Sequence, residues 1–177
     1  GCTVTDTFDI VTPTNPVASI DMAASSLCYT STGLATIVVD ATGGLAPYYY
    51  SLNAGPTQTS NTFVDLTPAT YDFNVMDSNG CTDTVQFTIE PELTANAVLA
   101  KDLDCSVSPD AEINVTVNGG YPAYTYEVAF NSGAYAAYAG AFPYTTPTAG
   151  TYRFRITDSQ GCISESNIVT VTPSETP

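Results

Sequence analysis

The sequence predicts an all-β protein built of two antiparallel β-sandwiches in tandem. Three observations lead to this prediction. Apolar and polar residues alternate along several short segments, turn-forming clusters recur about every ten residues, and blocks of sequence occur twice. With 177 residues, 44% of them apolar, the chain can form two small domains that each have a core.

The repetition is clearest where a strand pattern runs into a cysteine. Residues 69–81 (ATYDFNVMDSNGC) are matched by residues 150–162 (GTYRFRITDSQGC), 81 positions later. Earlier in each copy, residues 41–50 correspond to residues 117–126 at an offset of 76. The second copy therefore carries about five extra residues, which we place in Asn131 to Pro147 as a longer loop or an extra strand pair; this segment is called the insertion below.

The repeats predict three divisions of the chain. Residues 1–17 resemble the closing segment that follows Cys81 and Cys162, so they are expected to be the last strand of a preceding, truncated repeat. Residues 18–92 and 93–177 are then the first and second complete repeats. The alternative is that residues 1 to about 13 are donated to the sheet of a neighbouring subunit. Since each complete repeat has its own closing strand, we favour a segment cut from a longer tandem array.

Four segments show period-two alternation, with β-branched or aromatic residues facing one side and polar residues the other: residues 36–40, 70–75, 112–117 and 151–156. Turn clusters such as residues 77–80 (DSNG) separate such segments. About seven short strands per copy indicate an immunoglobulin-like sandwich.

Two further patterns occur in both copies. The glycine pairs at residues 43–44 and 119–120 end a strand before a proline-containing turn, where the chain must bend. They do not predict a phosphate-binding loop, because no helix follows and no lysine is near. Tyr71 and Tyr152 stand where a tyrosine corner would tie a turn to the next strand.

The charge balance excludes several classes of function. The chain has 18 Asp and Glu residues but only three basic ones, Lys101, Arg153 and Arg155, for a net charge of -15. Binding to nucleic acid or to anionic membranes is therefore not expected. No apolar run approaches the roughly 20 residues that cross a bilayer, so membrane insertion is not expected either.

The absence of histidine removes the Ser-His-Asp and Cys-His catalytic sets, imidazole metal sites and a pH switch near neutrality. Paired carboxylates could hydrolyse glycosides, but that chemistry needs a deep cleft, which small sandwiches rarely supply. We therefore expect no enzymatic activity.

The five cysteines suggest one disulfide per repeat. We predict Cys28 with Cys81 and Cys105 with Cys162, which leaves Cys2 without a partner. Each bond would close a loop of roughly 50 to 60 residues, stabilise a domain by roughly 4 kcal/mol and indicate an extracellular location. One geometric objection stands: in a plain immunoglobulin topology the two cysteines lie at opposite ends of the sandwich, so either the first strand is rearranged or the pairing differs. Zinc is not expected, since close Cys-x-x-Cys pairs and histidines are missing.

Taken in order, the pattern of Cys, strand, Gly-Gly, Pro, Tyr-x-Tyr, Thr-Tyr and Asp-Ser-x-Gly-Cys resembles the SprB-type repeat of bacterial gliding-motility adhesins and related giant surface proteins. The resemblance covers about 160 residues, in two full copies and a remnant. It implies a long filament of many immunoglobulin-like modules, exported by the type IX system and held on the bacterial cell surface. The insertion and residues 121–123 depart from the first copy, so the resemblance does not assign a role to each module.

Calcium is the one cofactor that the sequence suggests, because hard cations take clustered oxygen ligands. The candidate ligands are Glu90, Glu92, Asp102, Asp104 and Asp110. An Asp-x-Asp-x-Asp-Gly loop is missing, so we interpret these carboxylates as solvated and expect no cofactor unless calcium binds there.

Tyrosines in the insertion are candidates for carbohydrate contact by ring stacking, namely Tyr135, Tyr138 and Tyr144. The alternative is that these rings cover the edge of the sandwich. Residues 83–85 (DTV) resemble a short O-glycosylation motif of this bacterial group, with Thr84 as the acceptor.

The leading hypothesis for function is a structural repeat of a long extracellular adhesin or filament, with neighbouring repeats as partners. A second is a glycan- or cell-binding module that acts through the insertion, residues 131–147. A third is self-assembly of several copies into an extracellular fibre.

Overall fold

The computed structural model describes residues 14–106 and 108–174, which form strands, turns and loops. No helix long and apolar enough to cross a membrane occurs among these residues. The prediction of an all-β chain of antiparallel sheets is confirmed.

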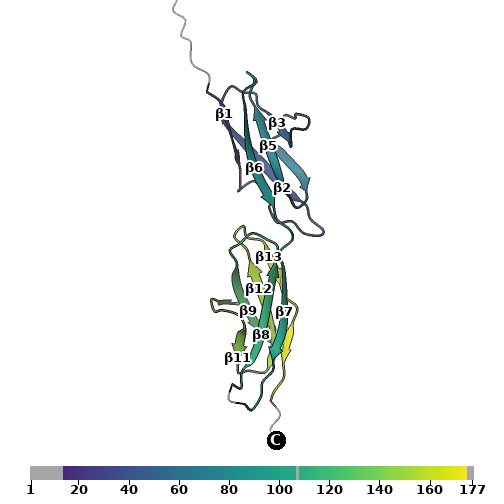
Figure 1. Ribbon diagram of the computed structural model, residues 1–177, viewed down its shortest axis with the longest axis vertical. Helices are drawn as coiled ribbons and strands as arrows, with labels where there is room; N and C mark the ends of the chain where they lie inside the picture. The colour runs from purple at the N-terminus through teal and green to yellow at the C-terminus, as the bar shows by residue number, and fades with distance from the viewer. Residues whose placement is uncertain (1–13, 107, 175–177) are drawn as a thin grey trace, which may run out of the picture. The chain divides into compact units, whose positions relative to one another are not determined.

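The first repeat contains two sheets of three strands each, in the orders β1-β2-β4 and β3-β5-β6 (Figure 1). The strands are β1 (Pro16–Ile20), β2 (Ala35–Gly43), β3 (Tyr49–Leu52), β4 (Thr62–Leu66), β5 (Ala69–Met76) and β6 (Thr82–Ile89). Its core follows the alternation in the sequence, because Ile37 and Val39 of β2 and Phe73 and Val75 of β5 are fully buried.

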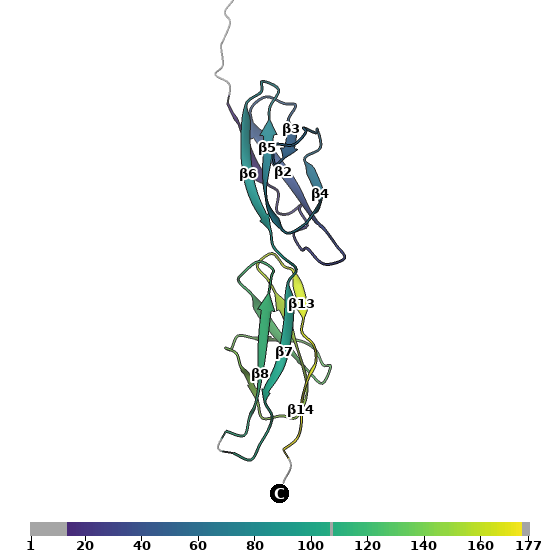
Figure 2. The ribbon, with the colours of Figure 1, turned by 45° about the vertical axis from the view of Figure 1, so that its right-hand side comes forward.

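The second repeat has the same two-layer plan (Figure 2). Its strands are β7 (Thr94–Lys101), β8 (Ala111–Asn118), β9 (Thr125–Phe130), β10 (Ala136–Tyr138), β11 (Tyr144–Thr146), β12 (Gly150–Thr157), β13 (Ile163–Glu165) and β14 (Val169–Val171). One sheet has the order β11-β8-β7; the other has the order β10-β9-β12-β13, with β14 also paired to β12. Ile113 of β8 and Phe154 and Ile156 of β12 are fully buried between the two sheets.

The insertion contains two strands, and each of them is added to a different sheet. β10 pairs with β9, and β11 pairs with β8. β11 takes the place that β4 has in the first repeat, so the added strand is β10. At the corresponding place the first repeat has an isolated bridge between Tyr50 and Gln58.

The tyrosine corner is present in the second repeat. The hydroxyl of Tyr152 donates a hydrogen bond to the carbonyl oxygen of Thr148 at 2.8 Å, and it lies 2.8 Å from the hydroxyl of Thr146. The turn before β12 is thus tied to the strand that it leads into, as immunoglobulin-like sandwiches require.

The domain boundaries differ from the predicted ones at two places. β1 begins at Pro16 and pairs with β2, so residues 16–17 belong to the first sandwich; a proline is tolerated there because it starts an edge strand. Grouping by contacts also places Ser26–Ala35 and Asp65–Ala69 with the residues from Ile89 onward. Sequence repetition assigns residues by their position along the chain, whereas compactness depends on contacts, so the two divisions need not agree. Residues 1–13, which make up most of the closing strand predicted for residues 1–17 and all of the alternative donated strand, lie outside the described residues.

Candidate functional site

The Asp-Ser-x-Gly-Cys motif forms the same hydrogen-bonded hairpin turn in both repeats. In the second repeat one carboxylate oxygen of Asp158 accepts the backbone N–H groups of Gln160 and Cys162, each at 2.9 Å. The N–H of Asp158 donates to the carbonyl of Cys162 at 3.0 Å, which closes the turn. Gly161 has a φ of +83°, a conformation that glycine adopts without strain.

The first repeat reproduces this turn bond for bond. Asp77 accepts the N–H groups of Asn79 and Cys81, each at 2.9 Å, and its own N–H donates to the carbonyl of Cys81 at 2.9 Å. Gly80 likewise has a φ of +83°. The motif therefore holds Cys81 and Cys162 in equivalent backbone positions.

The second carboxylate oxygen of each aspartate connects the turn to the Gly-Gly motif. In the first repeat this oxygen of Asp77 accepts a hydrogen bond from the N–H of Leu45 at 3.0 Å. In the second repeat the corresponding oxygen of Asp158 accepts one from the N–H of Tyr121 at 2.8 Å. A Cβ on Gly44 would lie 2.9 Å from the Asp77 carboxylate, and a Cβ on Gly120 would lie 2.9 Å from that of Asp158. The second glycine of each pair is thus needed both for its positive φ and for room beside the carboxylate.

The environment of Asp77 affects its ionisation. Asp77 is 1% exposed, and burial alone would raise its pKa. Hydrogen bonds from the backbone of Leu45, Cys81, Asn79 and Gly80 outweigh burial and hold the pKa of Asp77 below its ordinary value of 3.8. The turn therefore depends on an ionised carboxylate.

This turn lies at the end of the sandwich where the chain enters each repeat, called the upstream pole below. In the second repeat, the N–H of Gly120 donates to the carbonyl of Pro91 at 2.9 Å. In the first repeat, the N–H of Gly44 donates to the hydroxyl of Thr14 at 3.2 Å. Cys81 and Cys162 thus both stand at the upstream pole of their own repeat.

The disulfide joins cysteines of two different sequence repeats. Cys28 bonds to Cys162, with Cα atoms 5.4 Å apart and 134 residues of sequence separation. Both cysteines belong to the second compact unit, because Ser26–Ala35 groups with it. The predicted pairs, Cys28 with Cys81 and Cys105 with Cys162, are wrong.

The second repeat shows why pairing within one repeat fails. Cys105 lies in the loop before β8, whereas Cys162 lies at the upstream pole, where β8 ends. The eight residues of β8 span about 26 Å, and a disulfide needs Cα atoms within about 7 Å. The length of the strand therefore rules out the pairing of Cys105 with Cys162, and the position of the two cysteines at opposite ends of the sandwich is the sequence signal that points away from this pairing.

Cys28 stands in a loop with its own small hairpin. Thr30 and Gly33 exchange two backbone hydrogen bonds, of 2.8 and 3.2 Å. The N–H of Ser31 donates to the carboxylate of Glu92 at 3.1 Å. Glu92, a predicted calcium ligand, thus contacts the loop that carries Cys28.

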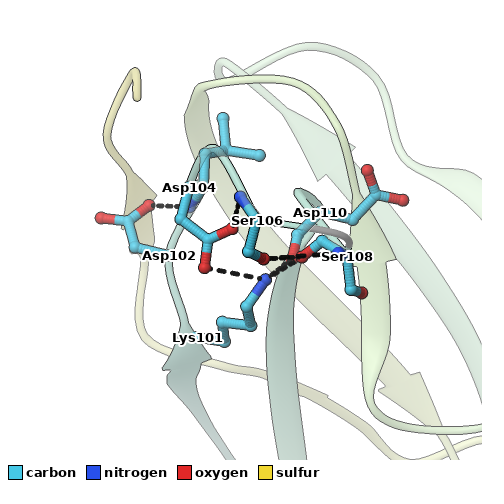
Figure 3. Close-up of polar contacts among 7 residues, drawn as sticks. Lys101, Asp102, Asp104, Ser106, Ser108 and Asp110 are labelled. Carbon is cyan, nitrogen blue, oxygen red and sulfur yellow. Dashed lines mark hydrogen bonds and ion pairs between the residues drawn. The ribbon is translucent and has the colours of Figure 1, made fainter. Parts of the chain in front are cut away.

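The loop that carries the three predicted calcium ligands after β7 folds around the side chain of a lysine (Figure 3). The ammonium group of Lys101 lies 3.3 Å from the carboxylate of Asp104 and donates to the carbonyls of Ser108 and Asp110, the latter at 3.2 Å. The pKa of Asp104 is lowered by hydrogen bonds from Ser106 and by Lys101. Asp102 instead accepts the N–H of Thr172 at 3.0 Å.

These carboxylates do not gather around one point. Figure 3 shows the side chains of Asp102 and Asp110 on opposite sides of the loop. Glu90 and Glu92 precede β7 and the aspartates follow it, about 26 Å away along eight strand residues. Within residues 14–106 and 108–174, no three His, Cys, Asp or Glu side chains are grouped so that they could hold a metal ion.

The three candidate tyrosines of the insertion are divided between two environments. Tyr138 and Tyr144 pack with each other, at 5.1 Å between ring centroids, and Tyr144 lies 5.4 Å from the core residue Phe154. Tyr135 instead lies against Arg155, whose guanidinium carbon is 3.7 Å from the ring centroid. Since Phe154 and Arg155 are adjacent in a strand, their side chains face opposite sides of the sheet.

Beside Tyr135 there is a pocket of about 150 Å³. Its lining includes Ser132 and Gly133 of the insertion, Thr151 and Arg153 of β12, and Ile168. Of the three predicted contact residues, Tyr135 lines this pocket.

Thr84, the predicted O-glycosylation acceptor, is exposed on β6. Its hydroxyl donates to the side-chain oxygen of Asn74 at 2.7 Å. This bond is one that neighbouring strands commonly make, so modification of Thr84 stays a prediction.

The two sandwiches and their repeated turns define a tandem of immunoglobulin-like, all-β repeats. Residues 23–57 and 98–129 match the family model described as SprB repeat, which is consistent with the SprB-type repeat that the motifs resemble. Both matched segments include a cysteine loop, the following strand and the Gly-Gly motif. No curated protein sequence matches the chain significantly.

Among solved structures, the chain is similar to the C-terminal 282-residue fragment of intimin in complex with the intimin-binding domain of the translocated intimin receptor. The TM-score is 0.51 at 12% identity, and the match covers 88% of this chain and 63% of that one. The three N-terminal domains of the Hoc capsid protein of bacteriophage RB49 give a TM-score of 0.40 at 15% identity, covering 89% of this chain and 59% of theirs. The four N-terminal immunoglobulin domains of Dscam1 isoform 4.4 give a TM-score of 0.40 at 15% identity, and the match covers 85% of this chain and 46% of that one. At these identities the similarity concerns the fold alone.

Proposed function

We propose that this chain is a force-transmitting segment of a long extracellular adhesin, in which disulfides carry tension past the folded sandwiches. The SprB repeats support a surface or adhesin-like module. The disulfide between Cys28 and Cys162 is the observation that carries the mechanical role.

When the chain is pulled from both ends, tension passes along the shortest covalent path between them. A covalent bond between Cys28 and Cys162 bypasses the residues between them, which number about 134. Those residues would otherwise extend by about 450 Å if both sandwiches unfolded. The bond therefore limits the length that a pulled segment can release.

The composition agrees with an exposed, extracellular role. A disulfide persists in oxidising surroundings, outside the cytosol. The net charge of -15 makes copies of the chain repel one another, which keeps a long surface filament soluble. We extend the proposal to export by the type IX system and to gliding motility, on the SprB resemblance alone.

Single-molecule pulling from the two chain ends tests the mechanical role. We expect the oxidised chain to release little contour length between Cys28 and Cys162, and the reduced chain to release about 450 Å more. A Cys81→Ser variant is the matched control, since it removes a thiol but keeps the disulfide. Equal contour lengths before and after reduction would overturn the proposal.

A second candidate function is glycan binding at the pocket beside Tyr135. The pocket lies where the insertion meets β12, and Arg153 and Ser132 place hydrogen-bond donors beside an aromatic ring. Hydroxyl and guanidinium groups can form hydrogen bonds with sugar hydroxyls. The intimin fragment that the chain is similar to is, in its structure, in complex with a receptor domain.

Binding of the purified chain to cell surfaces and polysaccharides tests this second function. Saturable binding that is lost in Tyr135→Ala but kept in Tyr144→Phe would support it. Deleting residues 131–141 is a poor test, because it removes β10 and its pairing with β9. Equal binding by the wild type and Tyr135→Ala would count against it. Self-assembly into a fibre stays a prediction without an observation of its own among the described residues.

A further inference from the structure

We propose that Cys81 is a second inter-repeat disulfide site, and that its partner is a cysteine of a preceding SprB repeat, at the position that Cys28 occupies in this one. The proposal rests on the geometry of the bond between Cys28 and Cys162 and not on the mechanical role. It predicts that every repeat of this kind is bonded to the repeat before it.

The cysteines of the two repeats fall into two types. Cys28 and Cys105 stand in the loop before the second strand of their repeat, and we call them opening cysteines. Cys81 and Cys162 follow the Asp-Ser-x-Gly motif, and we call them closing cysteines. The disulfide joins the opening cysteine of one repeat to the closing cysteine of the next.

Cys81 has every backbone feature that places Cys162 for its bond. Its N–H and carbonyl are held by Asp77 at 2.9 Å each, as those of Cys162 are held by Asp158 at 2.9 and 3.0 Å. Each aspartate is buried and is fixed to the residue that follows the Gly-Gly pair. The two closing cysteines therefore present their side chains from the same turn at the same pole.

The two sites differ in what covers the sulfur. Cys162 is 7% exposed and bonded, whereas Cys81 is half-buried and carries a free thiol. The opening cysteine of its own repeat, Cys28, is already bonded to Cys162. Cys81 thus has the scaffold of a disulfide site, and a preceding repeat supplies the opening cysteine that fits the pattern.

Formation of the bond is an oxidation, so it needs an electron acceptor. A disulfide reagent such as oxidised glutathione supplies one. The Cys81 thiolate attacks the reagent and releases one thiol. The thiolate of the opening cysteine then attacks the Cys81 sulfur and releases the second. Two protein thiols become one disulfide, and the reagent leaves as two thiols that carry the two electrons and two protons.

The test adds one repeat to the whole chain. Gly1-Cys2 corresponds to Gly80-Cys81, so residues 1–79 placed before the complete sequence form a full repeat that continues into it. Met22→Leu in the added copy marks its peptides by mass, at an exposed position. The protein is refolded with oxidised and reduced glutathione, and its disulfides are mapped by mass spectrometry without reduction.

We expect a peptide pair that joins Cys28 of the added copy to Cys81, beside the pair that joins Cys28 to Cys162. Labelling of Cys81 by a maleimide should fall at least tenfold relative to the chain without the added repeat. Cys28→Ser in the added copy should restore that labelling. The peptide pair that joins Cys28 to Cys162 is the internal control, because it shows that the same molecule has folded and formed its known disulfide.

Three results would overturn the proposal. The first is a reactive Cys81 in molecules that do contain the bond between Cys28 and Cys162. The second is a bond from the added Cys28 to any other cysteine. The third is absence of both bonds, which would remove the template for the inference. The mechanical role is judged separately, since pulling depends only on the bond between Cys28 and Cys162.

Discussion

Asp77 and Asp158 show at the scale of single residues how a short motif organises one end of a sandwich. Each carboxylate uses one oxygen for its own turn and the other for the Gly-Gly segment, about 35 residues away in sequence. Glutamate would be one methylene too long for the turn, and asparagine has only one acceptor oxygen. The motif therefore depends on aspartate for geometry and for its two acceptor atoms.

Replacing Asp158 by asparagine should lower the free energy of unfolding by about 1–3 kcal/mol. The asparagine amide can be oriented in two ways. In one, its NH₂ group faces the N–H of Tyr121, and in the other it faces the N–H groups of Gln160 and Cys162. In either case, backbone donors lose their acceptor. Chemical denaturation measures the change. Asp65→Asn, the same change at an exposed position, should cost less than about 0.5 kcal/mol. Equal costs at the two positions would contradict the role of the turn.

The stabilisation by Asp77 should depend on pH. Its pKa is lowered on folding, so its contribution is fully present above the ordinary value of 3.8 and is lost as the pH falls through the lower pKa of the folded state. The difference in unfolding free energy between the wild type and Asp77→Asn should be constant from about pH 5 to 8 and shrink below 3.8. Comparing the two proteins cancels the general effect of the acidic surface. A difference that does not change with pH would refute this account.

At the scale of elements, the insertion is a structural part of the second sandwich. β10 extends the sheet of β9, and β11 extends the sheet of β8. Between them Phe142 lies 5.1 Å from the ring of Tyr126 and 5.9 Å from that of Phe154. The aromatic residues that suggested a binding surface therefore mostly cover the core, and Tyr135 alone among the three candidates lies on the outer face.

Truncating Tyr144 should destabilise the second repeat. Its ring contacts Tyr138, Tyr152 and Phe154, and since it is only half-buried we expect Tyr144→Ala to cost about 2 kcal/mol, less than for a fully buried ring. Thermal or chemical unfolding measures it. Tyr144→Phe keeps the ring and should stay close to the wild type. A stable Tyr144→Ala variant would instead indicate a ring reserved for a ligand.

At the scale of the whole molecule, the disulfide defines the longest-range constraint on the chain. It closes a loop of about 134 residues, for which the entropy of the unfolded chain predicts a stabilisation of about 5 kcal/mol. Such a gain is a large fraction of the stability of a small domain. The chain should thus be much less stable in reducing than in oxidising surroundings.

Reduction should lower the midpoint of thermal unfolding, and the double variant Cys28→Ser with Cys162→Ser should show the lowered midpoint in either condition. Cys81→Ser should behave as the wild type, because it leaves the bond intact. Calorimetry with and without reductant measures these midpoints. An unchanged midpoint on reduction, with the loss of the bond verified, would argue against the stabilising role.

The amino-acid sequence by itself determined the local features of this protein. Alternation with a period of two assigned Ile37, Val39, Phe73 and Phe154 to the core, since successive side chains of a strand face opposite sides. The duplicated motifs predicted two equivalent sandwiches of SprB type, because turns depend on a few neighbouring residues.

Only the tertiary structure decided which distant groups meet. Cys162 bonds to Cys28 instead of Cys105, because a strand of about 26 Å separates the two ends of each sandwich. Of the acidic residues after β7, Asp104 pairs with Lys101 through its carboxylate and Asp110 through its backbone carbonyl, because the loop folds back on its own strand. Such pairings depend on where strand ends lie in space, and distance along the sequence does not report this.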